Sequence, residues 1–147
     1  MEVKKILWPT DLSPNAQAAL PCVQSLGEKY KTEVHLLYVI EDLGGHAPWY
    51  GEFDKSHINE IHDWEKKKAA ERLDEICSKY LEGCPLFVKH TTTGDPAEEI
   101  LKLAEDLHVG MIVMAASGRR GRFGFGSVTD KVVKNSPVPV VVIPAGR

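Results

Sequence analysis

Apolar residues fall along this chain in two alternating patterns. Short apolar runs rich in β-branched residues are typical of strands that are covered on both faces of a sheet. Between these runs, apolar residues recur at steps of three and four positions, which is typical of a helix with one buried face. The first pattern predicts strands over residues 3–8, 33–40, 86–92, 110–115 and 138–143, and the second predicts helices whose N-terminal caps are Ser13, Ser56, Asp95 and Ser127.

The order of these elements, β-α-β-α-β-α-β-α-β, predicts an α/β fold. Helical crossovers between apolar strands produce a parallel sheet with helices on both faces, which is called a doubly wound sheet. No internal repeat or change in composition divides the chain, so we expect one domain over residues 1–147. Because such a sheet binds ligands outside the carboxyl ends of its strands, the residues after the first and fourth strands are the first candidates for a site.

The segment after the fourth strand combines glycines, arginines and the start of a helix at Ser127. Glycines let backbone amides approach a ligand closely, and the first turn of a helix offers unpaired N–H groups at the positive end of its dipole. Residues 116–135 contain five Lys or Arg and one Asp, a net charge of +4, in a chain whose formal net charge is -3. We therefore expect a phosphate-binding site, and a solvated flexible turn is the alternative. The residues that carry this expectation are Gly118, Gly121, Gly124, Gly126, Arg119, Arg120 and Arg122.

The composition is that of an ordinary soluble domain and excludes several classes of protein. The net charge gives no overall electrostatic footprint for nucleic acid, and no apolar run reaches the roughly 18 residues that a membrane helix requires. The apolar run near the N-terminus ends at Pro9, too early for a signal peptide, and the three cysteines have no tight spacing. We therefore expect a cytoplasmic protein with reduced thiols that binds neither nucleic acid nor a membrane.

Several catalytic and metal-binding motifs are absent from the sequence. A dinucleotide-binding fold carries G-x-G-x-x-G after its first strand, where this chain has Pro-Thr-Asp-Leu-Ser-Pro, and the lysine of a P-loop is missing between Gly126 and Ser127. His57 and His62 are five residues apart and point to different sides of a helix, so we expect no metal site. No nucleophile lies beside a base. The tryptophans are expected to pack in the interior: Trp8, Trp49 and Trp64.

Three segments of the chain carry motifs of a known protein family. The chain opens with Ile6-Leu7-Trp8-Pro9-Thr10-Asp11-Leu12-Ser13, and Gly94-Asp95-Pro96-Ala97 precedes the third predicted helix. The first segment resembles the start of universal stress proteins, and the second is similar to the start of their third helix. The region from Ile112 to Pro144 is similar to their C-terminal part, so the resemblance spans essentially the whole chain. It implies a five-stranded parallel sheet of order 3-2-1-4-5 and a homodimer.

ATP-binding members of this family carry the motif G-x2-G-x9-G-[ST]. In this chain the motif begins with Ala115 instead of glycine, continues through Gly118, and reaches Gly126-Ser127 after seven residues instead of nine. The resemblance implies that the chain binds an adenine nucleotide, ATP, ADP or AMP, with or without Mg²⁺. It assigns the base and ribose to Pro9, Thr10, Asp11, Val39, Met114 and Ala115, and the phosphates to Gly118, Gly126, Ser127 and Val128, while the charge pattern adds Arg119 and Arg120.

The last strand predicts how two copies of the chain meet. In the order 3-2-1-4-5 it lies at an edge, where the outer backbone groups are unpaired in a monomer, and no charged residue follows it before Arg147. We expect a symmetric homodimer through Val138 to Ile143. The leading hypothesis is a cytoplasmic stress-response protein in which an adenine nucleotide is a regulatory ligand of the dimer. A nucleotide-free interaction module of the same fold and a slow ATPase are the alternatives, and the downstream protein partner is not identified.

Overall fold

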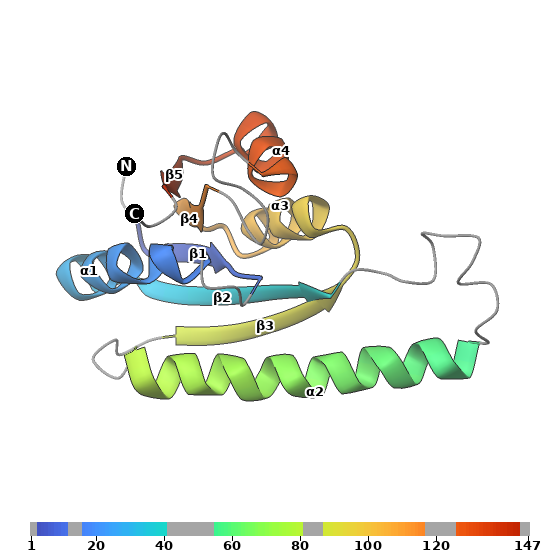
Figure 1. The fold of residues 1–147 in the computed structure, drawn as a ribbon. Coiled ribbons are helices and arrows are strands. Elements are labelled where there is room, and N and C mark those ends of the chain that lie inside the picture. The colour runs from blue at the N-terminus through green and yellow to red at the C-terminus, as the bar shows by residue number, and fades with distance from the viewer. Residues whose placement is uncertain (1–2, 12–15, 41–54, 81–86, 117–125, 145–147) are drawn as a thin grey trace.

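A computed structural model of the chain describes residues 3–11, 16–40, 55–80, 87–116 and 126–144 (Figure 1). The strands are β1 (Lys5–Pro9), β2 (Glu33–Ile40), β3 (Phe87–Thr93), β4 (Met111–Ala115) and β5 (Val140–Ile143). The helices are α1 (Leu20–Tyr30), α2 (Lys55–Tyr80), α3 (Pro96–Asp106) and α4 (Ser127–Asn135), and a 3₁₀ turn, Ala16–Ala19, precedes α1.

The five strands form one parallel sheet in the order β3-β2-β1-β4-β5, which confirms the expected fold class and strand order. β1 lies in the middle, with β2 on one side and β4 on the other. The chain therefore winds outward in both directions from β1. The carboxyl ends of β1 and β4 flank the point at which the winding reverses, where doubly wound sheets bind their ligands.

Each face of the sheet is covered by two helices. Ile6 of β1 belongs to a buried cluster with Leu73 of α2 and side chains of α1, whereas Leu7 belongs to a second cluster with Ile100 of α3 and Val132 of α4. Neighbouring residues of a strand point to opposite faces, so the continuous apolar run of β1 supplies both cores. Figure 1 shows α3 and α4 on the side of the sheet opposite α2.

β5 is shorter than the sequence pattern predicts, because it begins at Val140 and not at Val138. Ser136 forms a tight turn in front of it: the hydroxyl donates to the carbonyl of Val138 at 2.7 Å and accepts from the amide of the same residue at 3.1 Å. These bonds keep Val138 out of the strand ladder. The ladder begins with the carbonyl of Pro139, which accepts from the amide of Ile112 at 3.0 Å.

The first two helices also begin at positions that differ from the predicted ones. α1 begins at Leu20, and not at the predicted Ser13, because a 3₁₀ turn comes first. Ser13 itself lies outside the described residues. α2 begins at Lys55, one residue before the predicted Ser56.

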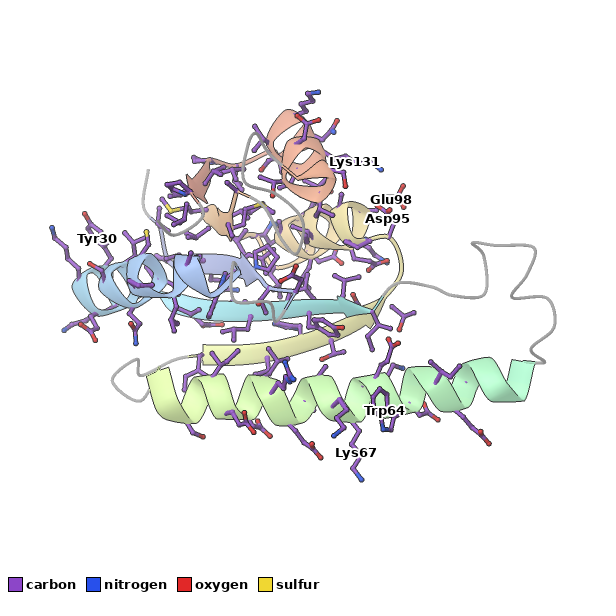
Figure 2. The ribbon with its side chains drawn as sticks, in the orientation of Figure 1. Tyr30, Trp64, Lys67, Asp95, Glu98 and Lys131 are labelled. Carbon is purple, nitrogen blue, oxygen red and sulfur yellow. The ribbon has the colours of Figure 1, made fainter. Side chains whose placement is uncertain are left out.

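The described side chains of α2 differ in burial between its two halves. Leu73 and Ile76 are buried against the sheet, whereas Ile61 is 36% exposed and Trp64 is 62% exposed. Figure 1 shows the N-terminal turns of α2 extending past the carboxyl ends of β2 and β3, and Figure 2 shows Trp64 pointing away from the sheet. The expectation of interior packing is therefore confirmed for Trp8, which is fully buried, and wrong for Trp64.

Other expectations concern residues that the structure describes only in part. Cys22 is a half-buried free thiol, while Trp49, Cys84 and the side chain of Cys77 lie outside the described residues. Among the helices in the described ranges, none combines the length and the apolar character needed to cross a membrane.

Candidate functional site

The carboxyl end of β1 presents the first group of predicted site residues. Pro9 ends the strand and is buried. Thr10 is also buried, and its backbone N–H donates to the carbonyl of Leu37 at 2.8 Å, which extends the pairing of β1 with β2 by one residue. Asp11 follows directly and is half-buried. The structure thus places the Asp11 carboxylate at the carboxyl end of the central strand, as the motif predicts.

α4 begins at the carboxyl end of β4 and is held there by two hydrogen bonds. The N–H of Gly126, the N-cap residue, donates to the carbonyl of Ala116 at 2.9 Å. The hydroxyl of Thr129 donates to the carbonyl of Ala115 at 3.0 Å in a buried position. These bonds place the N-terminal end of α4 at the carboxyl edge of the sheet, and the first turn of a helix, with its free N–H groups and positive dipole end, favours anions.

Three of the predicted ligands share one face of the sheet. Met114 belongs to the buried cluster between the sheet and the α3–α4 layer, and Val39 and Val128 pack against that cluster. Ala115 follows Met114 in the strand, so its side chain points to the opposite face. Its contribution to a site is therefore its backbone, whose carbonyl accepts from Thr129. Apolar groups of β2, β4 and α4 thus meet on the side of the sheet from which α4 presents its amides.

Two of the positively charged residues that follow β4 form ion pairs with carboxylates. The ammonium of Lys134 lies 2.9 Å from the carboxylate of Asp130, one turn earlier in α4. The ammonium of Lys131 lies 3.6 Å from the carboxylate of Asp95 and 4.0 Å from that of Glu98, and Figure 2 shows these three side chains where the N-terminal end of α3 faces the middle of α4. Exposed pairs of this kind contribute little stability. The expected positive charge at the site therefore rests on the arginines of the glycine-rich segment, whose roles stay predictions.

The glycine-rich segment itself lies outside the described residues, and with it Gly118, Arg119 and Arg120. Their roles stay predictions. Ser127 is described as the exposed first residue of α4, with its side chain at the helix end that would face a phosphate. Within the described ranges, no group of three or more His, Cys, Asp or Glu side chains is arranged to hold a metal ion.

Two threonines at this end of the sheet were not predicted as site residues. Thr129 fastens α4 to β4, and the only sequence signal for it is a hydroxyl in the first turn of a helix. Thr92 lies opposite Val39 in the register of β2 and β3. Its hydroxyl is buried and has no hydrogen-bond partner in the part of the chain that the structure describes. An unpaired buried hydroxyl is unfavourable, so this group fits a polar ligand placed at Val39.

Known proteins of similar sequence and structure point to one family. The sequence model of the universal stress protein family matches residues 2–144. The universal stress protein MJ0577 of Methanocaldococcus jannaschii is 34% identical over 157 residues, which cover 95% of this chain and 94% of that protein. The solved structure of MJ0577 has a TM-score of 0.86 at 31% identity, covering 100% of this chain and 99% of that chain. The universal stress protein UspA from Lactobacillus plantarum has a TM-score of 0.84 at 26% identity, covering 97% and 99%. This chain therefore belongs to the universal stress protein family.

Proposed function

We propose that this protein binds ATP or another adenine nucleotide at the carboxyl ends of β1 and β4. In this proposal the nucleotide is a regulatory ligand of a cytoplasmic homodimer that acts in a stress response. The observation that carries it is the docking of α4, whose first turn is held at the carboxyl end of β4 by the Thr129–Ala115 hydrogen bond of 3.0 Å. A helix end in this position of a doubly wound sheet suits a phosphate group.

Solved proteins of the same fold support the class of ligand. A universal stress protein in complex with cAMP has a TM-score of 0.64 to this chain at 16% identity. The universal stress protein from Archaeoglobus fulgidus, in complex with dAMP, has a TM-score of 0.66 at 20% identity. Both ligands combine adenine, a sugar and phosphate. At these identities the likeness extends to the fold alone, so the contacts proposed here come from the residues of this chain.

Each part of an adenine nucleotide has a matching group at the site. Val39 and Met114 offer apolar surface for the base, and the hydroxyl of Thr92, which has no partner among the described residues, can pair with a polar group beside it. The Asp11 carboxylate accepts hydrogen bonds from ribose hydroxyls. The phosphates meet the first-turn amides of α4 at Ser127 and Val128 and the backbone of Gly118, with charge-assisted bonds from Arg119 and Arg120. The N–H of Gly126 already donates to Ala116, so Gly126 contributes close approach to the helix end and not a donor.

The same residues support a binding role rather than a catalytic one. Asp11 is the single carboxylate among the predicted ligands, and one carboxylate without a partnering acid or nucleophile is not a hydrolytic site. A Mg²⁺ ion carried by the nucleotide would be held largely by phosphate oxygens and water.

The replacement Gly126→Val tests the phosphate site. The backbone at Gly126 has φ −62° and ψ 162°, a conformation that valine adopts without strain, so the fold should persist. The branched side chain occupies the space through which a phosphate reaches the helix end. We expect ATP affinity, measured by isothermal titration calorimetry, to fall at least about tenfold, which corresponds to about 1.4 kcal/mol.

The control is Val133→Ala, a change at a partly exposed position of the same helix, which should leave ATP affinity unchanged. Adenosine should lose less affinity than ATP in Gly126→Val, because it lacks the phosphates. If Gly126→Val binds ATP as tightly as the wild type, the phosphate site is wrongly placed. If the folded wild type binds no adenine nucleotide, the protein is the nucleotide-free interaction module instead.

A further inference from the structure

Three polar side chains form a connected chain from β2 to β3. His35 Nδ1 lies 2.8 Å from His90 Nε2, and His35 Nε2 lies 2.6 Å from Glu33 Oε1. The two rings stack with their centroids 5.1 Å apart. His35 is 3% exposed and His90 is half-buried. We call Glu33, His35 and His90 the histidine latch, because they join the edge strand β3 to its neighbour β2.

The carboxylate of Glu33 fixes the positions of the protons in the latch. An ionised carboxylate only accepts hydrogen bonds, so Nε2 of His35 carries a hydrogen and donates it to Glu33. Nδ1 of the neutral His35 is then an acceptor, and Nε2 of His90 is its donor. The separation of 2.8 Å suits this single hydrogen. A zinc ion bound to both nitrogens at about 2.0–2.1 Å would hold them about 3.3 Å apart. The observed separation of 2.8 Å therefore fits a hydrogen bond and not a shared zinc ion.

The contact between the rings needs one donor and one acceptor, so it is lost when protons occupy both facing nitrogens. Once both rings are charged, each nitrogen of the His35–His90 contact carries a hydrogen, and two positive charges lie next to each other. Burial, and after it the neighbouring His35, lower the pKa of His90 below its ordinary value. The folded chain therefore binds fewer protons at this position than the unfolded chain in mild acid, and acid favours opening.

Other charged groups around the latch do not offset this effect. On the opposite face of β3, Lys89 is already paired with Asp74 of α2. Glu33, the carboxylate of the latch, contacts His35. On β1, Lys5 lies opposite Glu33 in the register, and its ammonium donates to the carbonyl of Leu107 at 3.3 Å; this positive charge does not favour further protons on the latch. The helix α3 packs over β2 on the latch face, and its charged side chains are engaged elsewhere or exposed. Glu98 lies 4.0 Å from Lys131 of α4, Glu99 lies against Gly94 before the helix, and the exposed ones are Lys102, Glu105 and Asp106.

β3 depends on this link more than an inner strand would. It is an edge strand, paired with β2 alone. α2 covers one of its faces, but on the latch face Val88 is 39% exposed. Contacts between side chains on neighbouring strands are a main source of sheet stability. The loss of the His35–His90 bond should therefore loosen β3 against β2.

The latch lies one pleat away from the proposed nucleotide site. His90 is opposite Leu37, and two residues later Thr92 is opposite Val39, a step of about 7 Å along the strands. Val39 is the proposed adenine contact. We propose that protonation of the histidine latch lowers nucleotide affinity by loosening β3 against Val39, so that the protein responds to acidification. This inference rests on the proposed nucleotide function and adds its regulation.

Hydrogen exchange tests the latch by itself. We compare the protection factors of β3 amides in the full chain by NMR at about pH 7.5 and about pH 5.5, on either side of the ordinary histidine pKa of about 6.5. His90→Gln places a side-chain amide donor near the position of Nε2 and does not titrate. The wild type should lose about tenfold in protection at the lower pH, and His90→Gln should not. His108→Gln, at an exposed histidine outside the latch, should behave as the wild type. Equal protection at both pH values in the wild type, or an equal loss in His90→Gln, overturns the latch.

ATP binding tests the link to the nucleotide site. For the wild type and His90→Gln, Kd is measured at the same two pH values, so that the titration of ATP itself cancels in the comparison. The ratio of the wild-type Kd to the His90→Gln Kd should be about fivefold or more higher at the lower pH than at the higher pH. A factor of five is the lower end of typical couplings between sites. An unchanged ratio, with ATP bound at the higher pH, overturns the regulation. If no variant binds ATP at the higher pH, the nucleotide function and its regulation both fail, while hydrogen exchange still decides the latch.

Discussion

Thr129 joins the two halves of the proposed site through its hydroxyl. The side chain is 4% exposed, and its Oγ1 donates to the carbonyl of Ala115 at the end of β4. Ala115 precedes the glycine-rich segment, and Thr129 follows the proposed phosphate ligands Gly126 and Ser127 by one turn. Thr129 therefore acts as a positioning residue, which sets where the helix end lies without contacting the nucleotide.

Replacing Thr129 by Val keeps the shape of the side chain and removes the hydroxyl. The buried carbonyl of Ala115 then loses this donor, which costs about 1–3 kcal/mol. We expect Thr129→Val to lower the free energy of unfolding in urea by this amount, and to weaken ATP binding more than adenosine binding. Thr129→Ser keeps the donor and should retain most of the ATP affinity. If Val and Ser variants bind ATP equally well, this hydrogen bond does not position the site.

Roles that follow from local spacing could be predicted from the sequence, and roles that follow from strand register could not. Asp11 follows the end of a strand, and Gly126 directly precedes a helix, so both positions follow from the order of elements. The pairing of His35 with His90 spans 55 residues. It depends on which residue of β3 lies opposite which residue of β2, and periodicity does not determine that register.

At the scale of elements, α2 shows the same division between what a pattern predicts and what packing decides. Its apolar residues were expected to form one buried stripe, but the sheet covers only the C-terminal half. Lys68 lies over the ring of Trp64, with its ammonium 5.7 Å from the ring centroid. This arrangement gives the exposed indole a polar cover. The length of a helix is readable from sequence, whereas the extent of the surface beneath it is not.

Replacing two apolar side chains of α2 by alanine should therefore have different effects on stability. Leu73 is 1% exposed between α2 and the sheet, so Leu73→Ala should lower the free energy of unfolding by about 2–5 kcal/mol. Ile61 is 36% exposed on the other half of the helix, and Ile61→Ala should cost less than about 1 kcal/mol. Urea denaturation followed by circular dichroism measures both. Similar losses would mean that the N-terminal half of α2 is buried in solution.

The order of elements and the arrangement of the sheet were predictable because β1, β2 and β4 are apolar at nearly every position. Such strands must be covered on both faces, which requires helices between them. Element bounds were less predictable where polar side chains intervene. The Ser136 hydroxyl removes Val138 from β5, and nothing in the run Val-Pro-Val-Val-Val-Ile indicates that competition.

At the scale of the whole molecule, β5 forms one edge of the sheet and, among the described strands, pairs with β4 alone. The carbonyls of Pro139 and Ile143 accept from amides of Ile112 and Ala116 on the β4 side. Backbone groups of alternate residues point to opposite sides of a strand, so the N–H and C=O groups of Val140 and Val142 point outward. The proposed dimer interface therefore consists of the four residues of β5, Val140–Ile143. It is shorter than the predicted interface, which ran from Val138 to Ile143.

A second copy of β5 can satisfy these outward groups through a twofold axis, since each edge then supplies the donors and acceptors that the other needs. We expect the wild type to sediment as a dimer of the 16.3 kDa chain at concentrations of tens of micromolar. Val142→Lys adds a charge to the interface, and Val142→Pro removes an outward N–H while leaving the β4 side of the ladder intact. Both variants should sediment as monomers with an unchanged helical spectrum.

The matched control is Val133→Lys, which adds the same charge at a partly exposed position of α4 and should remain a dimer. The two Val142 variants separate the forces at the edge, because lysine acts through charge and proline through the backbone. If proline alone yields monomers, the contact depends on strand pairing rather than on apolar burial. A wild type that sediments at 16.3 kDa would contradict the dimer, and the nucleotide would then have to act on a single chain.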